Sequence, residues 1–268
     1  MNLLKLVGWE VERVTKPYLI LISLLVVTQF AWLGYFLWSE TAFYEEMRRT
    51  GTPDYVLTFS NYIGGTPFIL SIGFAVTAML MYSFWIWYRD FQGRGTFMMR
   101  LLMIPQQRMF VFTAKLFTMM LMVLGLFSIQ WIVLKIEYIA FTNWFNSQMM
   151  PISGSFERAI SFDGALAIMF PASLFNFFVH QIVIVLVILF IFTFVLIERS
   201  LWQHTIWASV FAGLKLVGIL AVPIIGYFFI EKRLIYDETL LFIGGVLVSM
   251  FFMTVWMIRH YLTKKLNV

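Results

Sequence analysis

The stretch FNFFVHQIVIVLVILFIFTFVLI, residues 175–197, contains no Asp, Glu, Lys or Arg and consists mostly of Phe, Ile, Leu and Val. About 20 consecutive apolar residues in a helix cross the hydrocarbon core of a bilayer, which is about 30 Å thick. A helix that is apolar on every side needs lipid or protein around its whole circumference. The stretch therefore predicts a transmembrane helix, and with it an integral membrane protein.

The rest of the chain repeats this pattern. Of the 268 residues, 61% are hydrophobic and 12% are charged, whereas a soluble domain is about half apolar and about a quarter charged. Stretches long and apolar enough to span a bilayer occur at residues 18–38, 66–88, 109–134, 175–197, 201–230 and 240–258. No connection between them is large enough for a soluble domain. We therefore expect an all-α fold with six transmembrane helices, forming one membrane domain over residues 1–268.

The charges of the connections predict the orientation of the chain. The connections on one side of the six predicted spans hold 12 Lys and Arg residues, and those on the other side hold six. Because cytoplasmic loops carry the excess of Lys and Arg, the side that holds 12 is predicted to be cytoplasmic. Both termini lie on that side. A multi-pass protein of the cell membrane, in a bacterial cytoplasmic membrane, is the expected location.

Two segments outside the spans have structure of their own. Leu3, Leu4, Val7, Val11 and Val14 recur at helical spacing, which predicts an amphipathic helix along the cytoplasmic membrane surface; a frayed terminus is the alternative. On the outer side, residues 135–174 end in an apolar run that Pro171 interrupts. This run is interpreted either as a kinked, partly re-entrant approach to the fourth span or as a surface helix before it.

The residue types exclude several kinds of chemistry. The chain has no Cys, so disulfides and thiolate-bound metals are excluded. His180, His204 and His260 have no spacing that pairs metal ligands on one helix face. The positive charge is spread over short connections and does not form one patch, so nucleic acid is not an expected partner. We expect no metal and no cofactor in this chain, and membrane lipids as its surroundings.

The cytoplasmic connection after the second predicted span has a recognisable order of helix signals. Gly93 and Gly95 are expected to end the span, Thr96 to cap a new helix and Pro105 to stop it, which predicts a helix of about two turns. That helix is mostly apolar, with Arg100 within it. An apolar surface on the cytoplasmic side needs a cover, and either lipid headgroups or a partner protein would provide one.

This connection resembles the one in type 2 ABC-transporter permeases (the ABC-2 type family). In that family an acidic residue, a Gly-Thr pair, an apolar helix, a Pro followed by a basic residue and a Lys at the head of the third span occur in this order. The matching positions here are Asp90, Gly95, Thr96, Leu101, Leu102, Pro105, Arg108 and Lys115. The family more usually has Glu at the position of Asp90. The six spans and the cytoplasmic termini also agree with the family's plan.

The resemblance implies the membrane-spanning permease subunit of an ATP-driven transporter, with export as the expected direction. The connection would then dock on a cytoplasmic ABC ATPase subunit, with Arg100 and Arg108 orienting the contact. The chain has no phosphate-binding loop of the Gly-x-x-x-x-Gly-Lys-Ser/Thr type, so it is expected not to be an enzyme itself, and ATP and Mg would bind to the partner subunit. A second permease subunit, identical or different, would complete a dimer.

Polar residues within the predicted spans suggest two roles. Lys215 lies within the fifth predicted span, where a lysine costs about 2.5 to 3.5 kcal/mol on translocon scales. It is a candidate for a translocation path or a subunit interface; the alternative is that its ammonium reaches the cytoplasmic headgroups. Gln130, Asn176, His180 and Gln181 are more consistent with hydrogen bonds between helices than with ligand binding.

Two other classes of function fit the sequence less well. A scaffold or peptide-immunity component without an ATPase would have the same topology. An intramembrane enzyme would need a nucleophile, an acid and a base, or metal ligands, converging at membrane depth. The scattered histidines and the single intramembrane lysine do not predict such a set.

Overall fold

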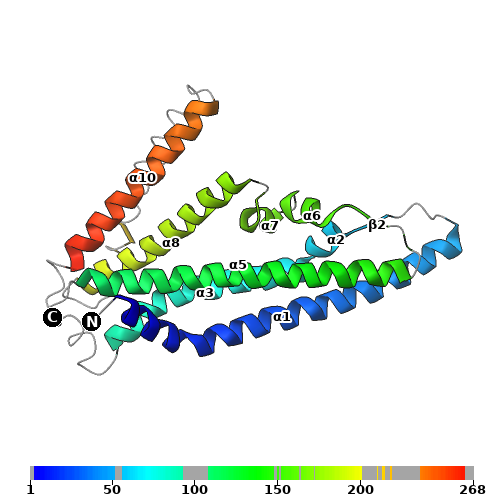
Figure 1. The fold of residues 1–268 in the computed structure, drawn as a ribbon, viewed down its shortest axis with the longest axis horizontal. Coiled ribbons are helices and arrows are strands. Elements are labelled where there is room, and N and C mark those ends of the chain that lie inside the picture. Colours follow the sequence, from blue (N-terminus) through cyan, green and yellow to red (C-terminus); the bar gives the residue numbers. More distant parts are fainter. Residues whose placement is uncertain are drawn as a thin grey trace. The chain divides into compact units, whose positions relative to one another are not determined.

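The computed structural model describes residues 3–51, 56–92, 108–147, 150, 152–162, 164–171, 173–200, 210, 213–214, 218 and 236–262 (Figure 1). Helices account for most of these residues. In chain order the elements are α1 (Leu3–Thr50), β1 (Leu57–Thr58), α2 (Phe59–Ile63), α3 (Thr66–Gln92), α5 (Arg108–Ser147), β2 (Ile152–Ser153), α6 (Phe156–Phe162), α7 (Gly164–Met169), α8 (Leu174–Ser200) and α10 (Tyr236–His260).

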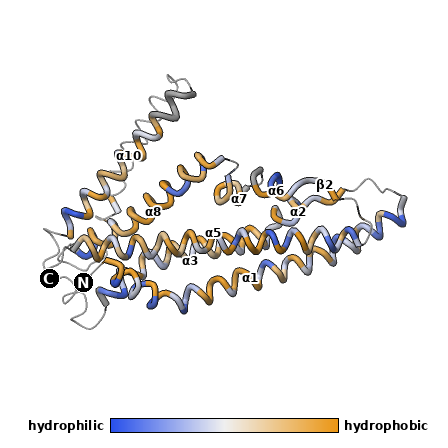
Figure 2. Tube along the Cα trace, viewed as in Figure 1, coloured by the Kyte–Doolittle hydropathy of each residue, from blue (hydrophilic) through white to orange (hydrophobic). Residues whose placement is uncertain are grey.

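Five helices in the described part of the chain, α1, α3, α5, α8 and α10, are long and apolar enough to cross a membrane. Each contains one of the predicted spans, and Figure 2 shows apolar residues along most of the length of α3, α5 and α8. The fold is that of an all-α polytopic membrane protein. The fifth predicted span, residues 201–230, lies almost entirely outside the described residues.

The first helix differs from the prediction. α1 continues through Pro17 for 48 residues, so the amphipathic segment and the first span form one helix. Its N-terminal segment is regular, which argues against a frayed terminus. The predicted apolar face is divided, since Val7 and Val14 are buried whereas Leu4 and Val11 are exposed. At about 1.5 Å per residue, α1 is about 72 Å long, so it extends well beyond a single bilayer crossing.

The segment predicted to lie outside differs from the prediction where it begins. α5 is 40 residues long and passes the predicted end of its span at residue 134. The apolar run before the fourth span is a separate short helix, α7, which fits the second of its two interpretations, a helix before an ordinary span; its position relative to the membrane stays a prediction. The all-α expectation has one local exception, because β1 and β2 pair in parallel, with Leu57 opposite Ile152 and Thr58 opposite Ser153.

The chain divides into two compact units. Unit 1 comprises residues 1–11, 80–120 and 181–268, and unit 2 comprises residues 12–79 and 121–180. The core of unit 2 is aromatic: Phe59 of α2 lies 5.5 Å from Phe141 of α5, and Tyr62 of α2 lies 5.6 Å from Phe36 of α1, between ring centroids. Such aromatic pairs contribute about 0.5–1.5 kcal/mol each beyond the area they bury. Short helix α2 is thereby held between α1 and α5.

Unit 1 has a ring cluster of its own. Trp87 of α3 is fully buried, and its ring centroid lies 5.5 Å from that of Phe192 of α8 and 6.4 Å from that of Phe112 of α5. Three helices that are distant in sequence therefore meet at one point. Elsewhere in the unit, Ile197 of α8 packs with Met257 of α10 in a small buried cluster.

Candidate functional site: a buried ion cluster in unit 1

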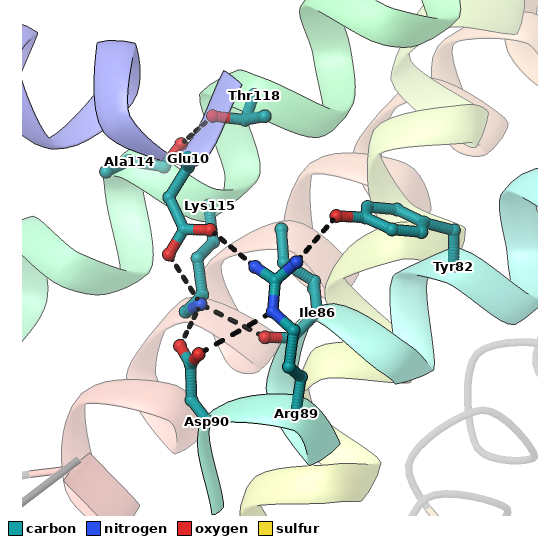
Figure 3. Close-up of polar contacts among 8 residues, drawn as sticks. All are labelled: Glu10, Tyr82, Ile86, Arg89, Asp90, Ala114, Lys115 and Thr118. Carbon is teal, nitrogen blue, oxygen red and sulfur yellow. Dashed lines mark hydrogen bonds and ion pairs between the residues drawn. The ribbon is translucent and has the colours of Figure 1, made fainter. Parts of the chain in front are cut away.

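Lys115, in the second turn of α5, is the centre of a group of charged residues (Figure 3). Its side chain is fully buried. The Nζ atom lies 2.5 Å from Oδ2 of Asp90, 2.8 Å from Oε1 of Glu10 and 3.1 Å from the carbonyl oxygen of Ile86. A lysine ammonium has three N–H donors, so these three acceptors use all of them.

The two carboxylates reach Lys115 from two different helices. Glu10 lies on α1 and Asp90 near the end of α3, and both side chains are almost completely buried. Glu10 is placed by its neighbours, because Leu6 and Val7 of α1 pack against Ala114 of α5 in a small buried cluster. α1, α3 and α5 are therefore joined by ionic contacts at one ammonium group.

Arg89 completes the cluster and balances its charge. Its Nη2 atom lies 3.0 Å from Oε2 of Glu10, its Nε atom 3.9 Å from Oδ1 of Asp90, and its Nη1 donates to the Tyr82 hydroxyl over 3.4 Å. Unlike the other three charged side chains, that of Arg89 is 21% exposed. Among the described residues of this cluster, two cations thus face two anions, and of these four side chains only the guanidinium has substantial access to the surroundings.

Such a cluster contributes little to the free energy of unfolding and more to the choice of one helix arrangement over others. Burying charges costs several kcal/mol per ion after relaxation, and good geometry only about offsets that cost. Losing one partner is different, because it leaves an uncompensated charge in a low-dielectric interior. The cluster therefore favours one arrangement of α1, α3 and α5 over others in which any of these charges would be unpaired.

A second polar contact joins α3 to α8 in the same unit. The hydroxyl of Tyr88 donates a hydrogen bond to Oε2 of Glu198, and the guanidinium carbon of Arg199 lies 4.7 Å from the centroid of the Tyr88 ring. An arginine over an aromatic face contributes about 0.5–1 kcal/mol at an exposed site and more when desolvated. The ends of α3 and α8 are therefore held together next to the ring cluster of Trp87.

The structure brings together two of the predicted coupling residues, Asp90 and Lys115, which are the first and last positions of the predicted motif. Arg108 is the first residue of α5. Lys215 and the predicted coupling helix lie outside the described residues, and with that helix six of its site positions: Gly95, Thr96, Arg100, Leu101, Leu102 and Pro105. Their assigned roles stay predictions.

Sequence reasoning missed Glu10 and Arg89 as members of this site. A signal for Glu10 was present, because positions 7, 10 and 14 share one helix face and the two valines on that face are buried. A carboxylate on an apolar face indicates a buried partner. Arg89 gave no such signal, since it adjoins Asp90 and was counted only as a cytoplasmic charge.

The glutamine prediction is confirmed for one residue. Gln130 of α5 and Gln29 of α1 exchange amide hydrogen bonds of 3.2 and 3.3 Å, and the Gln29 amide also donates to the Ser71 hydroxyl of α3 over 3.3 Å. Gln29 and Gln130 are almost completely buried. This amide group joins α1, α3 and α5 within unit 2.

Comparison of the chain with protein-family models, with curated proteins and with solved structures finds no match in any of the three. The class of protein is therefore defined by its own composition and fold, as a polytopic α-helical membrane protein. Among the residues that the structure describes, no three His, Asp or Glu side chains are grouped so that they could hold a metal ion.

The ion cluster joins the two helices that precede and follow the connection of residues 93–107. Asp90 and Lys115 flank residues 93–107, the connection between α3 and α5, and Glu10 ties the same point to α1. Packed interfaces of this kind move as units and do not deform continuously.

Proposed function

We propose that the chain is the membrane-spanning permease subunit of an ATP-driven exporter, with its ATPase supplied by a separate cytoplasmic subunit. The observation that carries the proposal is the buried contact between Asp90 and Lys115, with Glu10 bound to the same ammonium. These residues lie at both ends of the connection that resembles the coupling segment of type 2 ABC-transporter permeases. The contact would convert movement of a docked ATPase into movement of α1, α3 and α5.

The contacts within unit 1 support six spans with both ends on one side. Lys115, near the start of α5, contacts Glu10 near the start of α1 and Asp90 near the end of α3. Tyr88 of α3 contacts Glu198 near the end of α8. α1, α3, α5 and α8 thus alternate in direction, with these four ends on the same side.

The position of the last helix then favours a sixth span. Ile197, near the end of α8, packs with Met257, near the end of α10, which supports placing these two ends on the same side of the membrane. A chain that leaves one side and returns to it crosses an even number of times, and α10 supplies one crossing. The apolar stretch 201–230 is long enough to supply the other.

The charge distribution supports a cytoplasmic location for that side. Twelve of the Lys and Arg residues lie in or next to five helix ends on this side, namely the starts of α1 and α5 and the ends of α3, α8 and α10. Both termini would then be cytoplasmic, in a bacterial cell membrane. Two such chains, identical or different, with two ATPase subunits would form the transporter.

The test is co-purification of the chain from detergent-solubilised membranes of its own source. The variant carries Leu101→Asp and Leu102→Asp, which place two charges on the predicted apolar docking helix. A matched control carries Thr52→Asp and Tyr55→Asp, the same charges on the predicted outer side. We expect an ATPase with a phosphate-binding loop to accompany the wild type and the control and to be lost from the docking variant.

Two results would count against the proposal. If no ATPase accompanies the wild type, the chain is better explained as a scaffold or peptide-immunity component. If an ATPase accompanies all three proteins equally, it does not dock through residues 101–102. Size-exclusion chromatography of each variant checks that loss of the partner is not loss of folding.

A further inference from the structure

Glu137 of α5 is a buried acid in unit 2 that the proposed transport mechanism does not use. Its side chain is completely inaccessible, and so are Leu134 and Phe141, one turn away on either side of it. Neither carboxyl oxygen has a hydrogen bond of good geometry among the described residues, although the Tyr62 hydroxyl is near enough to interact with the carboxyl group. Burying a charged carboxylate without partners costs several kcal/mol, so an acid retained in this position calls for an explanation.

The groups around Glu137 determine whether its protonated or its ionised form is favoured. Tyr62 of α2 interacts electrostatically with Glu137, while its own hydroxyl donates to the carbonyl oxygen of Gln29 on α1 over 3.2 Å. Burial, and to a lesser degree Glu137, raises the pKa of the Tyr62 phenol above its ordinary value, so the phenol keeps its proton. The phenol has one proton, which it donates to Gln29 in this packing, so a hydrogen bond between Tyr62 and Glu137 can form at the same time only if the carboxyl group supplies the proton.

The nearest lysine on the same helix does not compensate Glu137. Lys135 is exposed, and its Nζ atom lies 4.2 Å from the ring centroid of Phe156 and 5.6 Å from that of Trp131. Tyr62 is the titratable group that acts on Glu137 from a neighbouring element. An ionised Glu137 would therefore face lone pairs in an apolar, aromatic environment, whereas a protonated one can donate to the phenol oxygen.

We propose that Glu137 is a proton-binding site, occupied in this packing of unit 2 and completing a chain of donors from Glu137 to Tyr62 to the carbonyl group of Gln29. A metal ion fits less well, because one carboxyl group supplies too few of the six or more oxygen ligands that a hard cation takes. The proton would tie α5 to α2 and α1. Its release would favour separation of these elements, since an ionised carboxylate gains from exposure to water.

The sign of the pH effect follows from this arrangement. The packed unit binds the proton of Glu137 more tightly than the unfolded chain does, so the unfolded chain loses it first as the pH rises. Stability contributed by the site is then complete at low pH and is lost as the pH rises. Glu137 loses its proton at a lower pH in the unfolded chain than in the packed unit. Between these two pH values, the one proton lowers the apparent melting temperature by about 2–4 °C per pH unit in a protein of more than 150 residues.

The test measures the melting temperature of the purified full chain in detergent between pH 5 and pH 9. Three proteins are compared: wild type, Glu137→Gln and the control Glu46→Gln, which changes an exposed acid of α1. The amide that Glu137→Gln introduces can donate to the phenol oxygen at every pH. We expect wild type and control to lose stability in parallel as the pH rises, and Glu137→Gln to lose less by about 2–4 °C per pH unit.

A second measurement reports on the proton directly and does not require the variant to be stable. Infrared difference spectra of the wild type between low and high pH should show loss of the carbonyl band of a buried protonated acid, with a shift in deuterated water. The proposal is overturned if the wild type shows no such band at the lowest pH at which it is folded. It is also overturned if all three proteins have the same pH slope, or if sodium and not pH controls the difference between them.

This inference is independent of the proposed function. It concerns unit 2 and requires no ATPase, so the pH measurement can succeed while the co-purification fails. The reverse outcome, an associated ATPase and no proton at Glu137, is equally distinguishable.

Discussion

The ammonium of Lys115 lies 2.5 Å from the carboxylate of Asp90, although the two residues are 25 positions apart and belong to different helices. Both side chains are completely buried. The contact joins α3 to α5 beside the connection of residues 93–107, and Glu10 extends it to α1. Three of the long apolar helices are therefore joined by ionic contacts at one buried lysine.

Replacement of this lysine should destabilise the protein strongly. Lys115→Met keeps most of the length of the side chain but leaves Glu10 and Asp90 without the ammonium that they share. Breaking a buried ion pair by removing one partner costs about 3–5 kcal/mol. Unfolding of the detergent-solubilised protein should show a loss of this size. The control Lys135→Met removes an exposed ammonium that lies over aromatic rings, and should cost about 0.5–1 kcal/mol.

A compensated variant separates charge imbalance from lost packing. Asp90→Asn combined with Lys115→Met removes one cation and one anion and leaves Glu10 paired with Arg89 over 3.0 Å. Because neutral replacement of a buried ion pair is often without net cost, most of the stability lost in Lys115→Met should return. If the double variant is as unstable as the single one, packing and not charge accounts for the effect.

The sequence predicted the helices well and the tertiary contacts only in part. Unbroken apolar stretches locate α3, α8 and α10 within a few residues, because lipid requires a long run of apolar side chains. Their ends are less predictable. α5 extends past residue 134 because Tyr138 and Phe141 of its C-terminal turns pack against Phe59 of α2, and hydropathy does not detect such packing.

The candidate site shows the same limit. The resemblance to type 2 ABC-transporter permeases points to Asp90 and Lys115, which match the first and last positions of the family's connection. Glu10 comes from a helix 105 residues away from Lys115, and only tertiary packing of Leu6 and Val7 on Ala114 determines that it reaches the lysine. The pairing of β1 with β2 was equally unpredictable, since strands of two residues have no periodicity to detect.

The buried amide pair should show a difference between single and double substitutions. Gln130→Leu alone leaves the Oε1 atom of Gln29 without its donor from Gln130, which should cost about 1–3 kcal/mol as an unsatisfied buried group. Gln29→Leu combined with Gln130→Leu removes both amides and should recover most of that loss. Thermal unfolding of the wild type, the two single variants and the double variant completes a double-mutant cycle. An additive result would mean that the amides do not stabilise each other.

Two tryptophans on α3 should respond very differently to truncation. Trp87 is completely buried among Phe112, Phe192 and the ammonium of Lys115, whereas Trp85 is 53% exposed. Trp87→Ala should cost about 3–5 kcal/mol, because it leaves a large cavity in the core of unit 1. Trp85→Ala should cost much less, since lipid or detergent can fill the space. Comparable losses would indicate that the assigned core of unit 1 is wrong.

A close approach between α1 and α5 should be detectable by adding a single methyl group. A Cβ atom at Gly125 would lie 2.5 Å from the hydroxyl oxygen of Tyr18, which donates to the carbonyl oxygen of Met122 over 2.9 Å. Gly125→Ala must therefore displace the hydroxyl and lose a hydrogen bond that contributes about 1 kcal/mol. When Tyr18→Phe is also present, the nearest ring atom would be at 3.6 Å, an ordinary contact, so the same Gly125→Ala change should be neutral or stabilising.

The control for this prediction is Gly73→Ala on α3, where no atom lies within 4 Å of the added Cβ. Because alanine favours a helix over glycine, this change should stabilise the protein by up to about 1 kcal/mol. Unfolding of the wild type, Tyr18→Phe, Gly125→Ala and the double variant measures the coupling between the two positions. If Gly125→Ala has the same effect whether or not Tyr18→Phe is present, the added methyl group does not meet the hydroxyl, and this approach of α1 to α5 is ruled out.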